Sequence, residues 1–366
     1  MNLPDFSLRE DCERLLSAIS SLSQRSKRKI RIMEVCGTHT MNFFRYGLKD
    51  LFPENLEVIS GPGCPVCVTS DSELDMLISA SSLPNVIAAT FGDMMRVPGT
   101  NSSLECEKAL GADIRIIYSP EELLNIAVAE PLKTVLFSGV GFETTAPLTA
   151  ALIAEASRRK ISNMKVFLFH KRILPAMEAL LQEGPSRIDG FLCPGNVSVI
   201  TGWKIYEPIA EIYKKPCVVA GFEPVDLLLG LFLLLRQIVE GRALVENEYA
   251  RAVTPEGNLK CQEEMEAVFS LTDASWRGLG VIPRSGFTFL PEFHSFDARA
   301  LISKVSLPPL RQKNQCKCGE ILKGMLSPEE CPLFSRGCTP ESPLGPCMVS
   351  SEGSCAIHYR FRKKYG

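Results

Sequence analysis

Eight short apolar runs recur between about residue 28 and residue 240, and most lead through a glycine-containing turn into a helical pattern. The runs are KIRIMEV (29–35), LEVIS (56–60), NVIAATF (85–91), DIRIIYS (113–119), TVLFSGVG (134–141), MKVFLFH (164–170), IDGFLCPG (188–195) and CVVAGFEP (217–224). Strands that are apolar throughout and alternate with helices are typical of parallel sheets covered on both faces. The pattern therefore predicts an α/β protein.

Eight strands are more than one doubly wound sheet usually contains. Two similar segments also suggest an internal repeat. VGFETTAPL (140–148) and AGFEPVDLL (220–228) share Gly-Phe-Glu between a predicted strand and a predicted helix. We therefore expect two doubly wound α/β/α subdomains that face a cleft, over residues 1–125 and 126–300. The Gly- and Pro-rich segment RGLGVIPRSGF (277–287) is interpreted as a loop or linker.

The remaining residues, 301–366, are expected to form a small irregular domain. Six of the fourteen cysteines lie in the last 51 residues: Cys316, Cys318, Cys331, Cys338, Cys347 and Cys355. Such a segment has little core of its own and needs a metal to hold it together. The spacing matches neither the ferredoxin run nor common zinc ribbons. A [4Fe–4S] cluster with a neighbouring dithiol accounts for all six thiols, and a zinc knuckle that uses four is the alternative.

The bulk composition argues against several classes of protein. The net charge is −2, and 45% of the residues are hydrophobic, so we expect neither a nucleic-acid-binding nor a membrane-bound protein. The longest apolar run, LLLGLFLLL (227–235), is too short to span a bilayer and predicts a buried helix. The first residues lack the apolar segment of a signal peptide, so we expect a cytoplasmic protein. In that reducing compartment, clustered cysteines indicate metal binding or redox chemistry.

Four segments with chemically active side chains follow predicted strands. They are CGTHT (36–40), GPGCPVC (61–67), FGDMMRVPG (91–99) and GVGFETT (139–145). In open α/β sheets, sites form beyond the carboxyl ends of the strands. We therefore expect one rim to gather the following candidate site residues: Cys36, His39, Cys64, Cys67, Asp93, Glu143, Thr144 and Thr145.

The pair Cys64 and Cys67 permits several interpretations. Pro65 restricts the loop, and the start of the following helix favours a thiolate, so the pair is suited to metal capture or disulfide exchange. A structural turn is the simplest alternative, and a zinc site completed by Cys36 and His39 is another. Cys36 could instead be a buried small residue at a strand end. Asp93 could cap a turn and Glu143 could begin a helix, so their functional interpretation depends on the shared rim.

Four stretches of the sequence together resemble one known family. MEVCGTHT, GPGCPVCVT, GFETT and the tail CTPESPLGPCMVSSEGSC are similar to the hydrogenase maturation factor HypD family. The resemblance implies assembly of the Fe(CN)2CO unit of [NiFe]-hydrogenases, with a HypC-type chaperone and a HypE-type cyanide donor that works with HypF. The chaperone would deliver the unit to the hydrogenase large subunit. It also implies two α/β domains that face a cleft, and a C-terminal [4Fe–4S] domain.

The resemblance also implies roles for individual residues. Cys36 would hold the mononuclear iron together with a chaperone cysteine, and Cys64 and Cys67 would be the redox-active pair beside it. The remaining candidates would line the cleft: His39, Asp93, Glu143, Thr144 and Thr145. The tail resembles the cluster environment of ferredoxin–thioredoxin reductase. That likeness gives Cys316, Cys331, Cys338 and Cys355 as cluster ligands and Cys318 with Cys347 as the extra pair, although Cys347 and Cys355 could exchange roles.

One position departs from the family pattern. The family usually has Pro-Gly-His-Val-Ser where this chain has CPGNVS (193–198), and Asn196 cannot titrate near neutrality. Our hypothesis is that electrons pass from the tail cluster through its dithiol to Cys64 and Cys67, and on to ligand chemistry at iron on Cys36. Two rivals remain, namely a stand-alone iron–sulfur thiol–disulfide oxidoreductase and a zinc-stabilised binding module. Whether the chain catalyses a step or only holds the metal is open.

Overall fold

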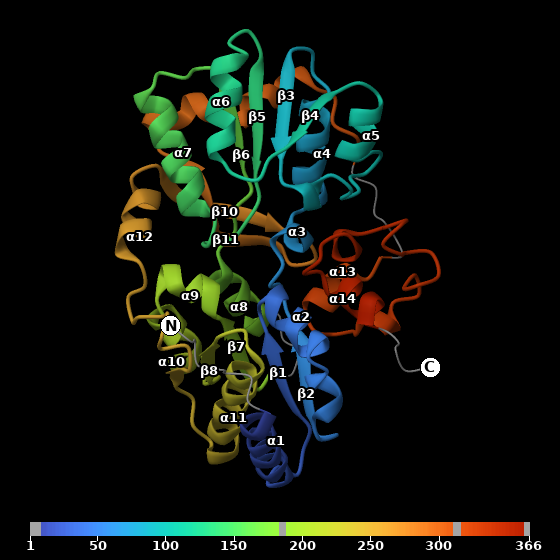
Figure 1. The fold of residues 1–366 in the computed structure, drawn as a ribbon, viewed down its shortest axis with the longest axis vertical. Helices are drawn as coiled ribbons and strands as arrows, with labels where there is room; N and C mark the ends of the chain where they lie inside the picture. The colour runs from blue at the N-terminus through green and yellow to red at the C-terminus, as the bar shows by residue number, and fades with distance from the viewer. Residues whose placement is uncertain (1–8, 183–187, 310–315, 362–366) are drawn as a thin grey trace.

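The computed structural model describes residues 9–182, 188–309 and 316–361. Two sheets lie at opposite ends of an elongated molecule, and a hairpin lies between them (Figure 1). The C-terminal segment packs at one side, beside the middle of the molecule.

The first sheet has five parallel strands. In spatial order they are β2 (Leu56–Ser60), β1 (Ile30–Glu34), β7 (Gly190–Pro194), β8 (Cys217–Ala220) and β9 (Val245–Asn247). Ile32 pairs with both Val58 and Gly190, so β1 and β7 are adjacent although far apart in sequence. Ile30, Ile32 and Met33 are fully buried, as expected for a central strand covered on both faces.

The second sheet has four parallel strands. In spatial order they are β4 (Asp113–Ile116), β3 (Val86–Thr90), β5 (Thr134–Gly139) and β6 (Met164–Leu168). Every residue of β3 is buried, and Val135, Leu136 and Phe137 of β5 are almost fully buried. Apolar side chains on both faces of these two strands therefore form the core of this half.

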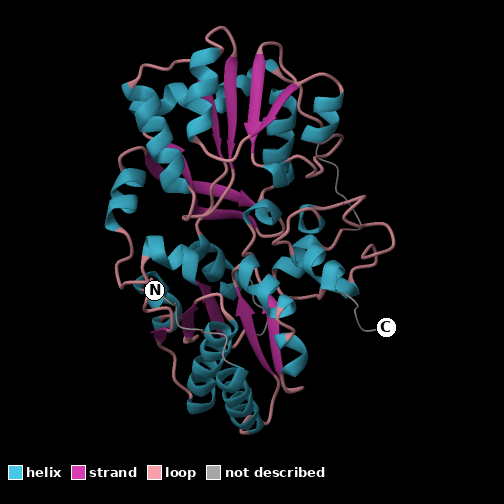
Figure 2. Cartoon of the chain, in the orientation of Figure 1, coloured by secondary structure: helices cyan, strands magenta, loops and turns pink. Residues whose placement is uncertain are grey.

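The strand order of each sheet reverses once. The reversal lies between β1 and β7 in the first sheet and between β3 and β5 in the second. A doubly wound sheet opens a crevice at this point, beyond the carboxyl ends of its strands. Figure 2 shows that the strands of both sheets run toward the middle of the molecule, so these ends face the same region. Each predicted apolar run contains one of β1 to β8, and the predicted α/β fold is confirmed.

The two sheets do not follow the expected boundary between residues 125 and 126. β1 and β2 pair with β7, β8 and β9, whereas β3 to β6 form the second sheet. The second sheet is therefore continuous in sequence, and the first is built from segments on either side of it. The local pattern of each run is the same, and the choice of partner strand depends on long-range packing that the pattern does not contain.

Residues 277–287, expected to be a loop, belong to a β-hairpin. Its strands are β10 (Phe269–Trp276) and β11 (Gly280–Phe289), which pair antiparallel. Gly278 and Gly280 have φ of +77°, which the tight turn requires. Pro283 is exposed and lies in the register shift between the Ile282–Ala274 and Gly286–Thr272 pairs, where a proline costs no ladder hydrogen bond. The Gly and Pro that suggested a loop are thus compatible with a strand.

The helices cover both sheets and connect the strands. They are α1 (Arg9–Gln24), α2 (Gly37–Arg45), α3 (Pro65–Val68), α4 (Asp71–Ser81), α5 (Leu104–Ala109), α6 (Glu121–Ala129), α7 (Ala146–Arg158), α8 (Ile173–Gln182), α9 (Gly195–Thr201), α10 (Glu207–Glu211), α11 (Pro224–Glu240), α12 (Leu259–Glu266), α13 (Cys318–Leu322) and α14 (Ser354–Phe361). The apolar run within α11 packs against α1, β7 and β8, so the predicted buried helix is confirmed. Among the described residues, no helix is long and apolar enough to cross a membrane.

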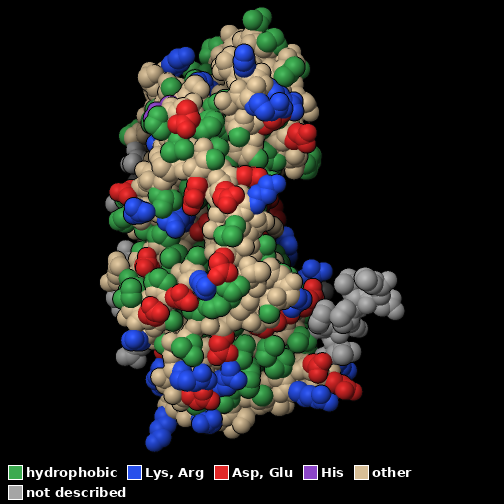
Figure 3. Space-filling view, turned by 90° about the vertical axis from the view of Figure 1, so that its left-hand side faces the viewer, with side chains coloured by type: hydrophobic (Ala, Val, Ile, Leu, Met, Phe, Trp, Pro, Cys, Tyr) green, Lys and Arg blue, Asp and Glu red, His purple; other side chains and the backbone are tan. Residues whose placement is uncertain are grey.

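The C-terminal segment contains little regular structure besides α13 and α14. Its short 3-10 helix η7 (Pro346–Met348) contacts α3, and α14 contacts α2. The tail thus packs on the segments that follow β1 and β2. On the face shown in Figure 3, Lys and Arg side chains are interspersed with Asp and Glu, in keeping with the small net charge.

Candidate functional site

The loops after β1 and β2 form one closely packed unit. Gly37 N–H donates to the Gly63 carbonyl (3.1 Å), and Gly61 N–H donates to the Glu34 carbonyl (2.8 Å). A Cβ atom on Gly63 would collide with the backbone of Cys36. Only glycine allows this approach, so the glycines of GPGC bring the second motif against the first.

Cys36 precedes the first turn of α2, and its thiol is buried. The side chain is 4% exposed, and its Sγ lies 3.9 Å from Oδ1 of Asn196, which follows β7. Burial first, and then the negative charge of Glu352, raise the pKa of Cys36 to about 12. At neutral pH the thiol therefore keeps its proton until a cation takes the proton's place on sulfur.

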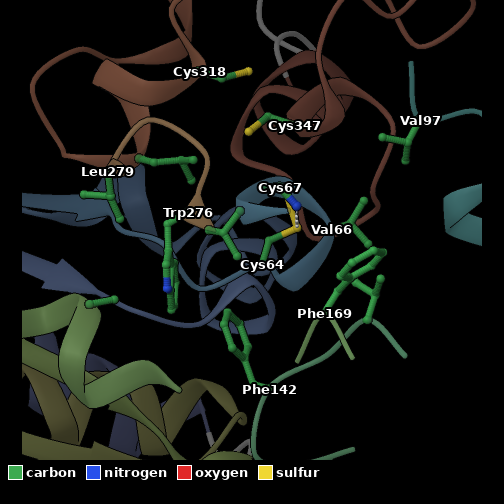
Figure 4. Packing of buried hydrophobic residues seen from close by; sticks show 14 of the residues in the cluster. Cys64, Val66, Cys67, Val97, Phe142, Phe169, Trp276, Leu279, Cys318 and Cys347 are labelled. Atoms are coloured by element: carbon green, nitrogen blue, oxygen red, sulfur yellow. Dashed lines mark hydrogen bonds between the residues drawn. A yellow bond between two sulfur atoms is a disulfide. The ribbon is translucent and has the colours of Figure 1, made fainter. Parts of the chain in front are cut away.

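Cys64 and Cys67 form a disulfide. Pro65 begins α3, Cys64 precedes it, and Cys67 N–H donates to Cys64 Sγ (3.2 Å). The two residues are 3% and 0% exposed, and Figure 4 shows them among buried apolar side chains that include Val66 and Phe142. Because both residues are buried, a reductant would have to reach this disulfide from within the protein or after the loop opens.

The tail connects the CGTHT loop to the second sheet. Thr38 Oγ1 donates to Glu352 Oε1 (2.6 Å), and a Cβ atom on Gly37 would lie only 2.5 Å from Glu352 Cβ. Ser350 Oγ donates to Asp93 Oδ2 (3.3 Å), and Asp93 follows β3. Asp93 is thus joined to the loop of Cys36 through two tail residues rather than through a shared sheet edge.

His39 lies on the buried side of α2. Its Nε2 is 3.0 Å from the Gly221 carbonyl, and Nδ1 has no hydrogen-bond partner among the described residues. Burial lowers the pKa of His39 to about 4, so the ring is neutral at pH 7. Among the described residues, Cys36, His39, Cys64 and Cys67 are not arranged as a metal-binding group, and the two later thiols are joined to each other.

Glu143, Thr144 and Thr145 follow β5 and come directly after Phe142, which lies in the same apolar cluster as Cys64 and Cys67. Glu143 Oε1 accepts from Ile173 N–H (3.0 Å), and its Oε2 has no partner in the described part of the chain. Burial raises the pKa of Glu143 to about 7. Thr145 precedes α7, and its hydroxyl donates to the Phe142 carbonyl (3.4 Å), whereas Thr144 is half-buried.

The candidate residues come from the strand ends of both sheets, and their gathering on a single rim stays a prediction. Residues that follow β1 and β2 supply the thiols, and residues that follow β3 and β5 supply carboxylates. A pocket of about 420 Å³ lies beside Glu143, with Thr201 and Phe269 among its lining residues. The first-sheet helix α9, the hairpin and the second sheet all contribute to this pocket.

Several buried polar residues near these ends were missed from the sequence. Glu34 accepts a hydrogen bond from Cys36 N–H (3.1 Å), and burial raises its pKa to about 8. Lys171 follows β6, is 1% exposed and forms an ion pair with Glu73 of α4. A charged residue inside an apolar run, as in KIRIMEV, was the available signal for Glu34. Glu352 had no such signal, because only the fold brings the tail to α2.

The tail cysteines gather in one buried region. Cys316 Sγ lies 3.2 Å from Cys318 Sγ, and the pKa of Cys355 is raised, first by its contact with Cys318 and then by burial. Leu344 N–H donates to Cys338 Sγ (3.3 Å). A Cβ atom on Gly345 would lie 2.8 Å from Cys318 Sγ and 2.9 Å from Cys316 Sγ, so only a glycine leaves the two sulfurs room.

The chemistry of the tail cysteines, and of the N–H group that donates to Cys338 Sγ, fits a bound iron–sulfur cluster. Thiolates are its usual ligands, and backbone N–H groups that point at the sulfurs help to set its potential. No group of three or more His, Cys, Asp or Glu in the described ranges is arranged as a metal site. Because Cys318 contacts both Cys316 and Cys355, the structure does not separate the expected ligands from the expected extra pair. The ligand set Cys316, Cys331, Cys338 and Cys355 stays a prediction.

The fold and the site define an α/β protein whose buried thiols lie at strand ends beside a cysteine-rich tail. The model of the family described as HypD, "Hydrogenase formation hypA family", matches residues 10–362. The chain is 44% identical to hydrogenase maturation factor HypD of Escherichia coli (strain K12), over 96% of this chain and 94% of the relative. It is 44% identical to a putative hydrogenase expression/formation protein of Methanocaldococcus jannaschii, over 92% and 93%. It is 43% identical to HypD of Rhizobium leguminosarum bv. viciae, over 98% and 95%. The chain belongs to the HypD family of hydrogenase maturation factors.

Proposed function

We propose that this hydrogenase maturation factor is the scaffold on which the Fe(CN)2CO unit of a [NiFe]-hydrogenase is assembled. A HypC-type chaperone would share the iron and carry the unit to the large subunit, and a HypE-type protein would donate cyanide. The observation that supports this most is the enclosure of Cys36. Both motif loops and the tail residue Glu352 surround one buried thiol at the point where the strand order reverses.

In this function the mononuclear iron is the substrate. The Cys36 S–H bond breaks, an iron–sulfur bond forms, and the proton leaves for solvent. A soft thiolate suits an iron centre that takes up cyanide and carbon monoxide. Asn196 Oδ1, 3.9 Å from Sγ, is a neutral group that can orient the thiol without competing for the proton.

The tail would supply electrons to this assembly. We propose that Cys316, Cys331, Cys338 and Cys355 hold a [4Fe–4S] cluster, and that Cys318 and Cys347 are the adjacent pair. The cluster, when bound, supplies one-electron transfer. Cys347 lies in η7, which contacts α3, and Figure 4 shows it on the side of the tail toward Cys64 and Cys67. This contact supports a role for the Cys64–Cys67 pair in redox chemistry.

Anaerobic co-purification with a HypC-type chaperone tests the scaffold. The wild-type complex should show infrared bands of iron-bound cyanide and carbon monoxide, and the Cys36→Ala complex should not. Bands retained in Cys36→Ala would refute the role of Cys36. Metal analysis of the same preparations should find iron and sulfide in a brown protein, whereas a zinc-stabilised module would be colourless.

The buried Cys64–Cys67 disulfide also supports the second candidate, a stand-alone iron–sulfur thiol–disulfide oxidoreductase. That candidate predicts turnover of a protein disulfide by the chain without bound mononuclear iron. An insulin-reduction assay on cluster-loaded, chaperone-free protein distinguishes the two. Absence of turnover, together with infrared bands in the chaperone complex, would leave the scaffold.

A further inference from the structure

Arg277, at the turn of the β10–β11 hairpin, is bonded to the segment that directly follows Cys67. Its backbone N–H donates to the Val68 carbonyl (2.9 Å), and its Nε donates to the Thr69 carbonyl (3.0 Å). Its Nη1 forms an ion pair with Asp71 Oδ1 (2.8 Å). One arginine thus contacts three nearby residues on the dithiol segment.

The remaining nitrogen of Arg277, Nη2, has no partner within the described part of the chain. Nη2 is buried and has no hydrogen bond to any described residue, and the whole side chain is only 10% exposed. A buried guanidinium normally satisfies all of its donors, because an unpaired one costs desolvation energy. The carboxylate of Asp71 is 34% exposed, so water screens its charge more than that of the guanidinium.

The hairpin tip also touches the cysteine-rich tail. Gly278 packs so closely on Gly319, the residue after Cys318, that a Cβ atom on either would overlap the other backbone. Trp276 forms a β-bridge with Thr69, and its indole N–H donates to Ser285 Oγ (2.8 Å), which fixes the tip. Figure 4 shows Trp276 and Leu279 of this tip in the same cluster as Cys64 and Cys318.

Arg277 directly precedes Gly278, so the contact of Gly278 with Gly319 places the charge of Arg277 close to the tail as well. Another buried ion pair, Lys171 with Glu73, has no net charge, because the two side chains are both buried and neutralise each other. Arg277 is therefore a buried positive charge between the dithiol segment and the tail.

We propose that Arg277 is a positioning residue that holds the Cys64–Cys67 segment against the tail, and that its guanidinium stabilises the negative charge of the reduced pair. This rests on the proposed function, in which Cys64 and Cys67 act as a redox pair. Reduction breaks the S–S bond and takes up two electrons; one sulfur binds a proton, the other remains a thiolate, and the second proton released by the donor passes to solvent. A dithiol donor supplies the electrons and becomes a disulfide. A positive charge nearby favours the reduced side of this equilibrium.

The redox equilibrium of the pair in the full chain tests the proposal. The chain is equilibrated anaerobically in dithiothreitol buffers of graded ratio, and alkylation of Cys64 and Cys67 is quantified by mass spectrometry. Arg277→Gln should shift the equilibrium about tenfold toward the disulfide, which is about 30 mV for a two-electron couple. Asp71→Asn removes the neutralising carboxylate and should shift it the other way, by about threefold. Arg277→Lys keeps the charge but loses part of the hydrogen bonding to Thr69 and Asp71, and it should shift the equilibrium less than Arg277→Gln does.

The opposite signs separate a charge effect from simple loosening of the structure. If Arg277 only held the loop in place, Arg277→Gln and Asp71→Asn would shift the equilibrium in the same direction, and that result would overturn the proposal. An unchanged equilibrium in Arg277→Gln would also overturn it. If Arg277→Gln does not fold, the shift of Asp71→Asn away from the disulfide still tests the charge effect. A wild-type pair that dithiothreitol cannot reduce would contradict the redox role itself, and with it the proposed function.

Discussion

The two parallel sheets reverse their strand order in the same way, yet their ends carry different side chains. The first sheet presents the Cys36 thiol and Asn196 where β1 and β7 meet, and the second presents Asp93 and Glu143 beyond β3 and β5. Backbone topology fixes where such a crevice lies, and the residues of the connecting loops decide its chemistry. The same fold thus offers a thiol group and a carboxylate group in one chain.

The two ends also share a property, because each buries a carboxyl group. Burial raises the pKa of Glu34 to about 8 and that of Glu143 to about 7. Glu34 is bonded to Cys36 N–H, whereas Glu143 keeps one oxygen without a partner among the described residues. The first carboxyl group supports a thiol loop, and the second is free to accept a further hydrogen bond.

The largest expected difference between the two ends is in iron retention. Cys36→Ser in the complex with the chaperone should lower bound mononuclear iron at least tenfold, because oxygen is a poor substitute for a thiolate. Glu143→Gln should retain the iron, since that variant keeps the Cys36 thiol. Metal analysis of desalted complexes measures both, with Cys261→Ser as the matched cysteine control. Equal loss in Cys36→Ser and Glu143→Gln would remove the distinction.

The stability of the protein should depend on the buried ion pair between Lys171, which follows the second sheet's strand β6, and Glu73. Lys171→Met leaves Glu73 buried without its cation, and the free energy of unfolding should fall by about 3–5 kcal/mol. Urea unfolding at pH 7 measures the change. Lys108 is exposed, and Lys108→Met should change the free energy by less than about 0.5 kcal/mol. A loss below about 1 kcal/mol in Lys171→Met would show that the pair is dispensable.

The buried carboxyl group of the second sheet should make stability depend on pH. The folded pKa of Glu143, about 7, exceeds its ordinary value of 4.5, so its stabilising contribution is complete below pH 4.5 and is lost as the pH rises through 7. Between pH 6 and pH 8 it loses about 1 kcal/mol. Glu143→Gln should remove this loss. Between pH 6 and pH 8, the free energy of unfolding of the variant should therefore rise by about 1 kcal/mol relative to that of the wild type.

Urea unfolding at pH 6 and pH 8 gives the difference between the two proteins. The comparison with the variant is needed because His39 and His170 act in the opposite direction, since burial lowers the pKa of both. An identical pH dependence in wild type and Glu143→Gln would contradict the assignment to Glu143.

The smallest effect is expected at Asn196. Its amide is exposed and lies 3.9 Å from Cys36 Sγ, so Asn196→Ala should change the rate of Cys36 alkylation by about twofold. Asn196→His should instead make that rate depend on pH near roughly 6.5, where imidazole titrates. Asn101→Ala, at another exposed position, serves as the control. A pH-independent rate in Asn196→His would place that side chain away from the thiol.

The sequence was sufficient to predict the individual strands, but not their partners. Each of β1 to β8 lies within a predicted apolar run, because a strand buried on both faces needs apolar residues throughout. β1 pairs with β7 rather than with β3, and nothing in KIRIMEV distinguishes these partners. The hairpin was missed because Gly278, Gly280 and Pro283 resemble loop punctuation, which a two-stranded sheet tolerates.

The candidate site was predictable where a motif carried it. Cys36 and the Cys64–Cys67 pair were found as motifs, and the structure brings their loops together through Gly37 and Gly63. Glu352 and Arg277 lie far away in sequence, and their contacts depend on how the tail and the hairpin pack. Such contributions become visible only when the fold is known.

The continuity of the second sheet has a consequence for synthesis and for engineering. The second sheet behaves as an insertion into the first, because β3 to β6 all lie in sequence between β2 and β7. During translation β1 emerges early, yet its neighbour β7 is made only after the whole insertion. Cys36 therefore leaves the ribosome long before Asn196 can reach it, and the thiol site is completed late. No single cut of the chain yields the first sheet as one fragment, whereas excision of the insertion would keep its strands together.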